Sequence, residues 1–161
     1  MKNARRKTRL THQIFEELVH DSYKSKSKLQ PSHCEECGAV YRRGRWRWGK
    51  PAQSSHATLC PACRRTRDRL PAGYVSLAGD YFRAHRDEVL ARVRNCESAE
   101  RSEHPLERIM AVQADGAGAV VTTTDAHLAR RIGEALRKSF KGEIEFHYNR
   151  ADNLLRVEWR R

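Results

Sequence analysis

The last part of the chain alternates between apolar and polar residues, which predicts two β-strands. Every second residue is apolar in two runs, one with Ile144, Phe146 and Tyr148 and one with Leu155, Val157 and Trp159. Because successive side chains of a strand point to opposite faces, each run places its apolar residues on one face. A loop around residues 151–153 joins the two runs, so this segment predicts a hairpin.

Two helices are predicted before this hairpin, because apolar residues recur there at helical spacing. The first extends from about Asp80 to Glu100, and one side of it carries Tyr81, Phe82, Val89, Leu90 and Val93. The second begins after the capping residue Asp125 and is closed by Gly142. Its apolar residues are Leu128, Ile132, Leu136 and Phe140.

Residues 107–113 and 118–124 predict a second hairpin, because Asp115-Gly116 between them is a strong turn signal. Residues 74–161 therefore have the order helix, hairpin, helix, hairpin. This order predicts an α+β module in which two helices cover one face of a four-stranded antiparallel sheet.

The first part of the chain contains less that can be buried. Residues 1–30 predict a basic arm and a short helix from about Thr11 to Tyr23, with an apolar face formed by Ile14, Phe15, Leu18 and Val19. The run Lys24–Lys28 is expected to be a solvated linker. Residues 31–73 contain four of the five cysteines and predict a separate metal-binding module.

The positive charge is concentrated in this first part of the chain. The net charge is +12, and residues 1–33 carry 8 Lys/Arg against 3 Asp/Glu, while residues 34–73 carry 9 against 3. The first 73 residues therefore hold +11 of the net charge. Such asymmetry indicates a half that faces a polyanion and a half that is nearly neutral. Charge alone leaves nucleic acid, an anionic membrane surface and an acidic protein open as partners.

Two C-x-x-C pairs predict one metal site. Cys34 and Cys37 form the first pair, and Cys60 and Cys63 form the second. A C-x-x-C turn places two thiolates within reach of one tetrahedral ion, and Gly38 after the first pair permits the backbone geometry of a zinc knuckle. Two knuckles joined by an intervening hairpin complete a closed Cys₄ site, so the predicted Zn²⁺ is structural rather than catalytic. Hydrophobic residues make up 39% of the chain, so its core is modest and a metal would help to stabilise it.

Other interpretations of the cysteines are weaker. Neither pair lies between a strand and a helix of a βαβ unit, which argues against a thioredoxin-like motif. His33 and His56 flank the knuckles and are alternative ligands. Cys96 is expected to be a small apolar residue on its helix rather than a nucleophile.

Between the two C-x-x-C pairs, arginine and tryptophan alternate in the segment Tyr41–Lys50. In a strand from about Arg45, Arg45 and Arg47 share one face, and Trp46 and Trp48 share the other. The arginines suit phosphates, whereas the tryptophans either stack on bases or pack under the knuckles, and packing is favoured. A second basic cluster, Arg64–Arg69, directly follows Cys63.

With the arm, these elements form one predicted phosphate-binding surface with little sequence readout. Its candidate RNA-binding residues are Lys2, Arg5, Arg6, Lys7, Arg9, Arg42, Arg43, Arg45, Trp46, Arg47, Trp48, Lys50, Arg64, Arg65, Arg67 and Arg69.

Motifs of enzymes and membrane proteins are missing from the sequence. It contains no phosphate-binding glycine loop, no nucleophile elbow and no paired catalytic carboxylates, so we expect no enzymatic activity and no small-molecule substrate. No run approaches the roughly 20 apolar residues of a membrane span, and no apolar segment follows the N-terminus as in a secretory signal. We therefore expect a cytoplasmic protein without a membrane partner.

Several motifs carry a family resemblance. They are C-x-x-C-G-x-x-Y-x-x-G-x-W-x-W from Cys34, L-C-P-A-C-R-R-x-R-D-R-x-P-A-G-Y from Leu59, A-H-R-D-E, H-P-L-E-R-I-M, and V-V-T-T-T-D-x-H-L-A-R-R-I-G-E-A-L. The chain resembles a group of small bacterial proteins related to the NMD family, the archaeal and eukaryotic adaptors of the large ribosomal subunit. Those adaptors have zinc knuckles followed by α+β modules, and they have a second zinc site for which this chain lacks cysteines.

The resemblance implies a ribosome-associated protein that binds rRNA and ribosomal proteins, with a role in ribosome stability, hibernation or assembly. Two other hypotheses remain from the residues alone. One is a zinc-ribbon regulator that binds DNA, although no helix-turn-helix is recognisable. The other is an RNA-processing enzyme.

Overall fold

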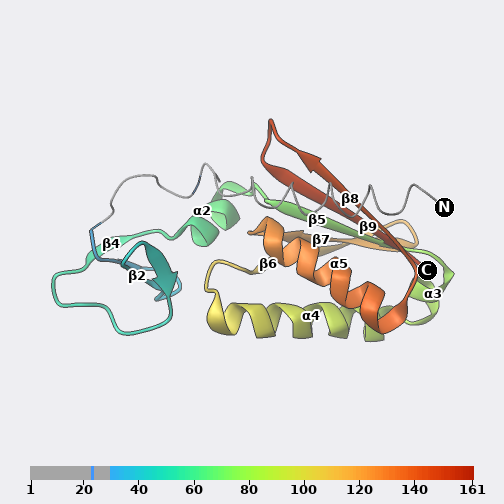
Figure 1. Ribbon diagram of the computed structural model, residues 1–161, viewed down its shortest axis with the longest axis horizontal. Coiled ribbons are helices and arrows are strands. Elements are labelled where there is room, and N and C mark those ends of the chain that lie inside the picture. Colours follow the sequence, from blue (N-terminus) through green and yellow to red (C-terminus); the bar gives the residue numbers. More distant parts are fainter. Residues whose placement is uncertain (1–22, 24–29) are drawn as a thin grey trace, which may run out of the picture.

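The computed structural model describes residue 23 and residues 30–161 (Figure 1). The predicted arm with Lys2, Arg5, Arg6, Lys7 and Arg9 therefore lies outside the described residues, as do the predicted helix before Tyr23 and the linker 24–28. The described chain forms two parts, a small one that contains the cysteine pairs and a larger one that contains the long helices.

The small part, which we call the cysteine module (residues 30–70), is built on a four-stranded sheet. Its strands are β1 (Ser32–Cys34), β2 (Val40–Arg42), β3 (Arg45–Arg47) and β4 (His56–Thr58), and its helix is α2 (Pro61–Asp68). The strand order is β3-β2-β1-β4. Strand β1 runs antiparallel to β2 and parallel to β4.

The larger part, the α+β module (residues 73–161), has a five-stranded sheet with the order β6-β7-β5-β9-β8. The strands are β5 (Gly73–Ala78), β6 (Ile109–Asp115), β7 (Gly118–Thr123), β8 (Glu143–Asn149) and β9 (Leu154–Arg160). The helices are α3 (Asp80–Ala84), α4 (Arg86–Glu103) and α5 (Ala126–Phe140). Helices α4 and α5 lie side by side on one side of the sheet (Figure 1).

The predicted apolar faces form the core of this module. Phe82, Val89 and Val93 are buried beneath the sheet, as are the four predicted apolar residues of α5. In the last hairpin, Ile144 pairs with Trp159 and Phe146 with Val157, so the two alternating runs share one face. Asp125 caps α5, because its carboxylate accepts the backbone N–H of His127. Cys96 is partly buried against the same core.

The predicted four-stranded antiparallel sheet is wrong, because a fifth strand lies at its centre. Strand β5 separates the two hairpins and pairs antiparallel with β7 and parallel with β9. Only Val75 and Leu77 mark its buried face clearly, and this pattern is too short to distinguish a strand from a loop. Its partners are also distant in the sequence, so no local turn indicates the pairing.

The single helix predicted from Asp80 to Glu100 is divided in two. His85 lies between α3 and α4 with φ −124° and ψ 32°, outside the helical region. Its backbone N–H still bonds to the carbonyl of Tyr81, and its ring stacks on that of Tyr81 with centroids 4.2 Å apart. The break lets both segments keep their apolar residues against the core.

Within residues 30–161, none of the helices combines the length and the apolar character that crossing a membrane requires.

Candidate metal centre

The first cysteine pair lies at the end of β1. Cys34 is the last residue of that strand, and its backbone N–H bonds to the carbonyl of Ala39 at 2.7 Å. Gly38 donates to the carbonyl of Cys34 at 2.9 Å, which closes the turn around Cys37. Gly38 has φ 76°, a conformation that glycine adopts without strain, as the knuckle prediction required.

The second pair lies at the start of α2. Cys60 is the residue before the helix, and its Sγ accepts the backbone N–H of Cys63 at 3.4 Å. Pro61 follows at the first helical position, which a proline tolerates well. Parallel pairing of β1 with β4 sets Cys34 opposite Thr58, so the second knuckle reaches the first. As a result, the backbone N–H of Cys60 lies 3.3 Å from Sγ of Cys34.

The four predicted ligands come together as one set. The Sγ atoms of Cys34, Cys37, Cys60 and Cys63 all lie within 4.8 Å of one another. Sγ of Cys37 and Sγ of Cys60 are 3.7 Å apart, and a tetrahedral zinc with Zn–S bonds of about 2.3 Å requires about 3.8 Å. Cys34, Cys60 and Cys63 are at most 4% exposed. The donor atoms and their spacing therefore fit a closed, four-coordinate metal site.

The alternative histidine ligands do not join this set. The group that can hold a metal consists of the four cysteines, and Nδ1 of His33 instead pairs with Oγ of Ser55 at 2.8 Å. His56 lies exposed on β4.

Two other groups of possible ligands are weaker. They are Glu100, His104 and Glu107 at the end of α4, and Glu145, His147 and Glu158 on the exposed face of β8 and β9. Surface carboxylates often approach one another without a metal, so we give these groups no role.

The environment of the thiols sets their protonation. Burial raises the pKa of Cys60 to about 11 and also raises that of Cys63. Burial acts in the same direction on Cys34, but backbone N–H groups of Cys60, Cys37 and Glu36 outweigh it and lower the pKa of Cys34 to about 7. Without metal at neutral pH, Cys60 and Cys63 therefore carry protons, while Cys34 is partly ionised.

Metal binding should consequently release protons. Zinc binds thiolates, so at pH 7 it must displace the protons that the four thiols still carry, those of Cys60 and Cys63 among them. We expect calorimetric zinc titrations in buffers of different ionisation enthalpy to show this release, and zinc affinity to fall as the pH is lowered. Binding without proton release would contradict the protonation states given above.

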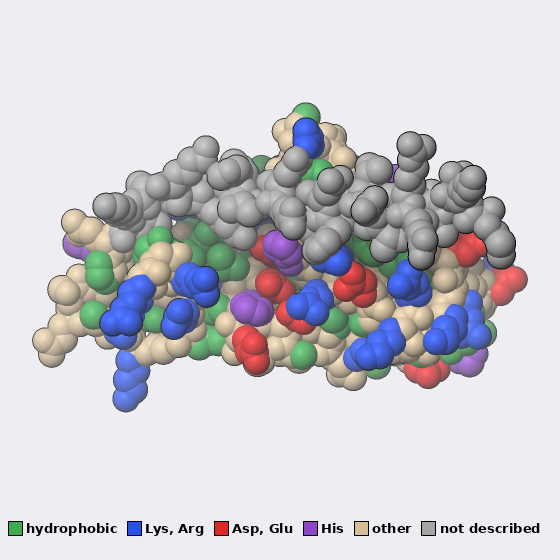
Figure 2. Space-filling view, viewed as in Figure 1, with side chains coloured by type: hydrophobic (Ala, Val, Ile, Leu, Met, Phe, Trp, Pro, Cys, Tyr) green, Lys and Arg blue, Asp and Glu red, His purple; other side chains and the backbone are tan. Residues whose placement is uncertain are grey.

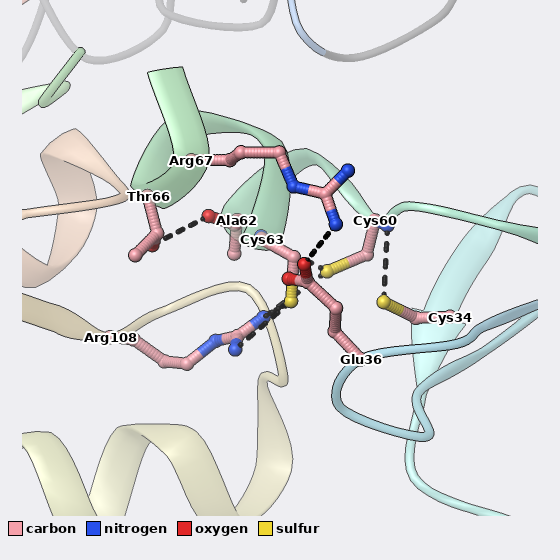
Figure 3. A network of polar contacts seen from close by, with 8 residues as sticks. All are labelled: Cys34, Glu36, Cys60, Ala62, Cys63, Thr66, Arg67 and Arg108. Carbon is pink, nitrogen blue, oxygen red and sulfur yellow. Dashed lines mark hydrogen bonds and ion pairs between the residues drawn. The ribbon is translucent and has the colours of Figure 1, made fainter. Parts of the chain in front are cut away.

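Arg108 is a member of the site that the sequence reasoning missed. Its Nη2 lies 3.1 Å from Sγ of Cys60 and 3.4 Å from Sγ of Cys63 (Figure 3). The same atom lies 3.6 Å from Sγ of Cys37. Burial acts to lower the pKa of Arg108, but the hydrogen bond to Cys63 and the cysteine charges outweigh it and raise that pKa. Arg108 follows Cys63 by 45 residues, so knuckle spacing gave no signal for it.

The predicted basic residues of the β2–β3 hairpin lie exposed around this site. We call Arg42, Arg43, Arg45, Arg47 and Lys50 the basic hairpin, and all of them are exposed. Figure 2 shows Lys and Arg side chains at this end of the molecule and others along the rest of the same face. Nη2 of Arg42 bonds to the backbone carbonyl of Lys50, so its guanidinium is held along the loop.

The two tryptophans have different surroundings. Trp46 is partly buried against the cysteine cluster and lies near the ring of Tyr41, with centroids 5.4 Å apart. This agrees with the favoured packing interpretation. Trp48 is 39% exposed, and its Nε1 donates to the backbone carbonyl of Arg101 in α4 at 2.7 Å. Trp48 therefore connects the cysteine module to the α+β module.

Helix α2 directs the arginines of the second basic cluster to different sides, three toward solvent and one inward. Arg64, Arg67 and Arg69 are exposed, and Arg67 forms an ion pair with Glu36 of the first knuckle. The guanidinium of Arg67 lowers the pKa of the Glu36 carboxyl.

Arg65 faces inward instead. It is 4% exposed, its Nη1 donates to the carbonyl of Leu70 at 2.9 Å, and its guanidinium lies 4.3 Å from the centroid of the Tyr23 ring. These contacts give Arg65 a role in packing.

Comparisons of this chain with known proteins gave no match among models of protein families, among curated proteins or among solved structures.

Proposed function

We propose that this protein is a zinc-binding, non-enzymatic RNA-binding factor that associates with the ribosome through rRNA. The observation that carries the proposal is the basic hairpin, whose five cationic residues are all exposed beside the tetracysteine site. Phosphate groups attract such an array strongly, and rigid placement of the charges reduces the entropy lost on binding.

Zinc is the ion that best suits the centre. Four thiolates in a closed tetrahedral arrangement are typical of structural zinc sites, and they leave no position open for a substrate or a reactive water. The role of the metal is to hold both knuckles, and with them the basic hairpin and α2, in a fixed arrangement. The module's own core supports this role, because it consists mainly of the ligands themselves.

The ribosome is proposed as the partner for two reasons. The charge of the first 73 residues favours a polyanion, and the zinc-knuckle and Thr122–Leu136 segments resemble those of the ribosomal adaptors of the NMD family. Stability, hibernation and assembly of the ribosome in the cytoplasm are the roles that this resemblance suggests. The basic arm and the hairpin would contact rRNA, while the α+β module would contact RNA or a ribosomal protein.

Removing two charges of the basic hairpin tests the RNA contact. We expect Arg45→Ala with Arg47→Ala to weaken rRNA binding. The steepness of log K against log salt should fall by about 1 to 2, because fewer phosphate contacts form and fewer counterions are released on binding. Fluorescence anisotropy with an rRNA fragment over a salt series measures both quantities. Arg94→Ala with Arg137→Ala is the matched control, since both residues are exposed and lie on α4 and α5.

Unchanged affinity and slope in the hairpin variant would contradict the proposal. Competition between duplex DNA and rRNA separates an RNA-binding factor from a DNA-binding regulator. Sucrose-gradient sedimentation of the tagged protein from growing and starved cells tests the ribosome itself. A protein that stays at the top of the gradient under both conditions is not ribosome-associated.

A further inference from the structure

The guanidinium of Arg108 connects the two modules. Arg108 belongs to the loop between α4 and β6 of the α+β module, yet its side chain extends into the cysteine module and ends at the sulfur atoms (Figure 3). The three sulfur contacts of Nη2 involve Cys37, Cys60 and Cys63. The guanidinium therefore covers the face of the tetracysteine set that these three residues form.

The backbone of Arg108 is fixed from both sides. Its N–H donates to Oγ1 of Thr124 at 2.9 Å, and its carbonyl accepts the N–H of Thr124 at 2.9 Å. Oγ1 of Thr124 in turn donates to the carbonyl of Leu106 at 2.6 Å. Thr124 is 3% exposed and directly precedes the cap of α5. Movement of Arg108 is therefore tied to the start of α5.

A second anchor comes from α4. The backbone N–H of Ile109 donates to Oε1 of Glu97 at 2.8 Å. The loop that carries Arg108 is thus held by both long helices. Such support is typical of residues that orient a metal site from outside its ligand set.

The charge of Arg108 requires a partner at this position. Its Nε is buried and has no hydrogen-bond partner among the described residues, and the contacts of its Nη atoms are to cysteine sulfur. Burying a guanidinium is costly unless nearby negative charge compensates it. Four thiolates around a divalent ion carry net negative charge, so a loaded centre compensates the guanidinium and accepts its N–H groups as charge-assisted bonds.

We propose that Arg108 is a positioning residue of the metal centre and that its N–H···S bonds make docking of the cysteine module on the α+β module depend on the metal. This inference depends on zinc binding, one part of the proposed function, and not on the RNA partner. Two other contacts across this junction are uncharged, namely the Trp48–Arg101 hydrogen bond and the packing of Leu106 on the cysteine cluster. The carboxylate of Glu36 adds an electrostatic attraction to Arg108 itself. The guanidinium therefore supplies the part of the junction that responds to charge.

Metal affinity and the cobalt spectrum test the role of Arg108 in the full-length protein. We expect Arg108→Met to bind one zinc about 10- to 100-fold more weakly than the unchanged protein in a chelator competition. With Co²⁺ as the probe, the sulfur-to-cobalt charge-transfer band should shift, because the thiolates lose their hydrogen bonds. Arg108→Lys restores the charge and should recover part of the affinity. Arg94→Met removes an exposed arginine of α4 and should leave both readouts unchanged.

Docking has its own readout. The indole N–H of Trp48 bonds across the junction, so its NMR resonance and its hydrogen exchange report the contact between modules. In the unchanged protein we expect zinc to protect this proton, and in Arg108→Met and Thr124→Val we expect zinc to protect it less.

The possible outcomes separate the two proposals. If the unchanged protein fails to bind one Zn²⁺ or Co²⁺, the proposed zinc function fails and this inference fails with it. If the metal binds but Arg108→Met has the affinity, cobalt spectrum and Trp48 protection of the unchanged protein, the inference alone is overturned. If Arg108→Met does not fold, the same comparison between Arg108→Lys and the unchanged protein decides the question.

Discussion

Substitution of Cys60 by serine is expected to abolish tight zinc binding and rRNA binding while the α+β module stays folded. Cys60 is fully buried, caps α2 and lies beside the other ligands, so its loss removes one of four thiolates and weakens the second knuckle. Structural zinc supplies about 10–16 kcal/mol of folding free energy in small zinc peptides, and this module has little else to replace it. The α+β module has a separate core, so we expect its packing to be independent of the metal.

Native mass spectrometry and NMR test this expectation. The Cys60→Ser protein should carry no zinc, and the resonances of residues 30–70 should lose their dispersion while those of residues 73–161 keep theirs. A chelator should have the same effect on the unchanged protein. Cys96→Ser is the control, because Cys96 lies on α4 outside the ligand set. If Cys60→Ser retained rRNA binding, the metal would not be what organises the basic hairpin.

Truncation of Trp159 to alanine should cost about 3–5 kcal/mol of stability, the range typical of a buried large aromatic residue. Trp159 is 1% exposed on β9 and packs near the ring of Phe140, with centroids 6.4 Å apart. Its Nε1 also donates to the carbonyl of Lys141 at 2.8 Å, so truncation leaves that carbonyl without this partner.

Urea unfolding followed by circular dichroism measures this loss. Trp48→Ala provides the matched comparison, since Trp48 is 39% exposed, and it should cost about 1 kcal/mol or less. A difference below about 1 kcal/mol between the two variants would show that Trp159 does not hold the α+β core together. The urea concentration at the unfolding midpoint should depend on zinc for the cysteine module and should be independent of zinc for the α+β module.

These expectations place stability and binding in different modules. The core that stabilises the protein lies between α4, α5 and the five-stranded sheet, whereas the exposed cationic residues proposed to bind RNA lie on the basic hairpin and along α2. Arg108 joins the two, because its backbone belongs to one module and its guanidinium to the other. A change in metal occupancy would therefore be transmitted from the cysteine module to the loop that precedes β6.

The sequence by itself determined the features that depend on neighbouring residues. Periodicity located α5 and the two strands of the last hairpin with their apolar faces, and Asp125 was recognised as a cap. The two C-x-x-C pairs identified all four cysteines of the candidate metal centre, because a knuckle is formed within a few residues. The exposure of Arg45 and Arg47 and the partial burial of Trp46 also followed from alternation along one short strand.

Only the tertiary structure decided the features whose partners are distant in the chain. Strand β5 owes its place to β7 and β9, neither of which is adjacent to it in sequence. Arg65 belongs to the predicted basic cluster, yet it turns inward, because the orientation of α2 and the contacts with Leu70 and Tyr23 select its direction. Arg108 reaches the thiolates because α4 and α5 hold its loop there. Local sequence patterns indicate the propensity and periodicity of one segment. They contain no signal for which distant surface that segment packs against, and this is what the tertiary structure decides.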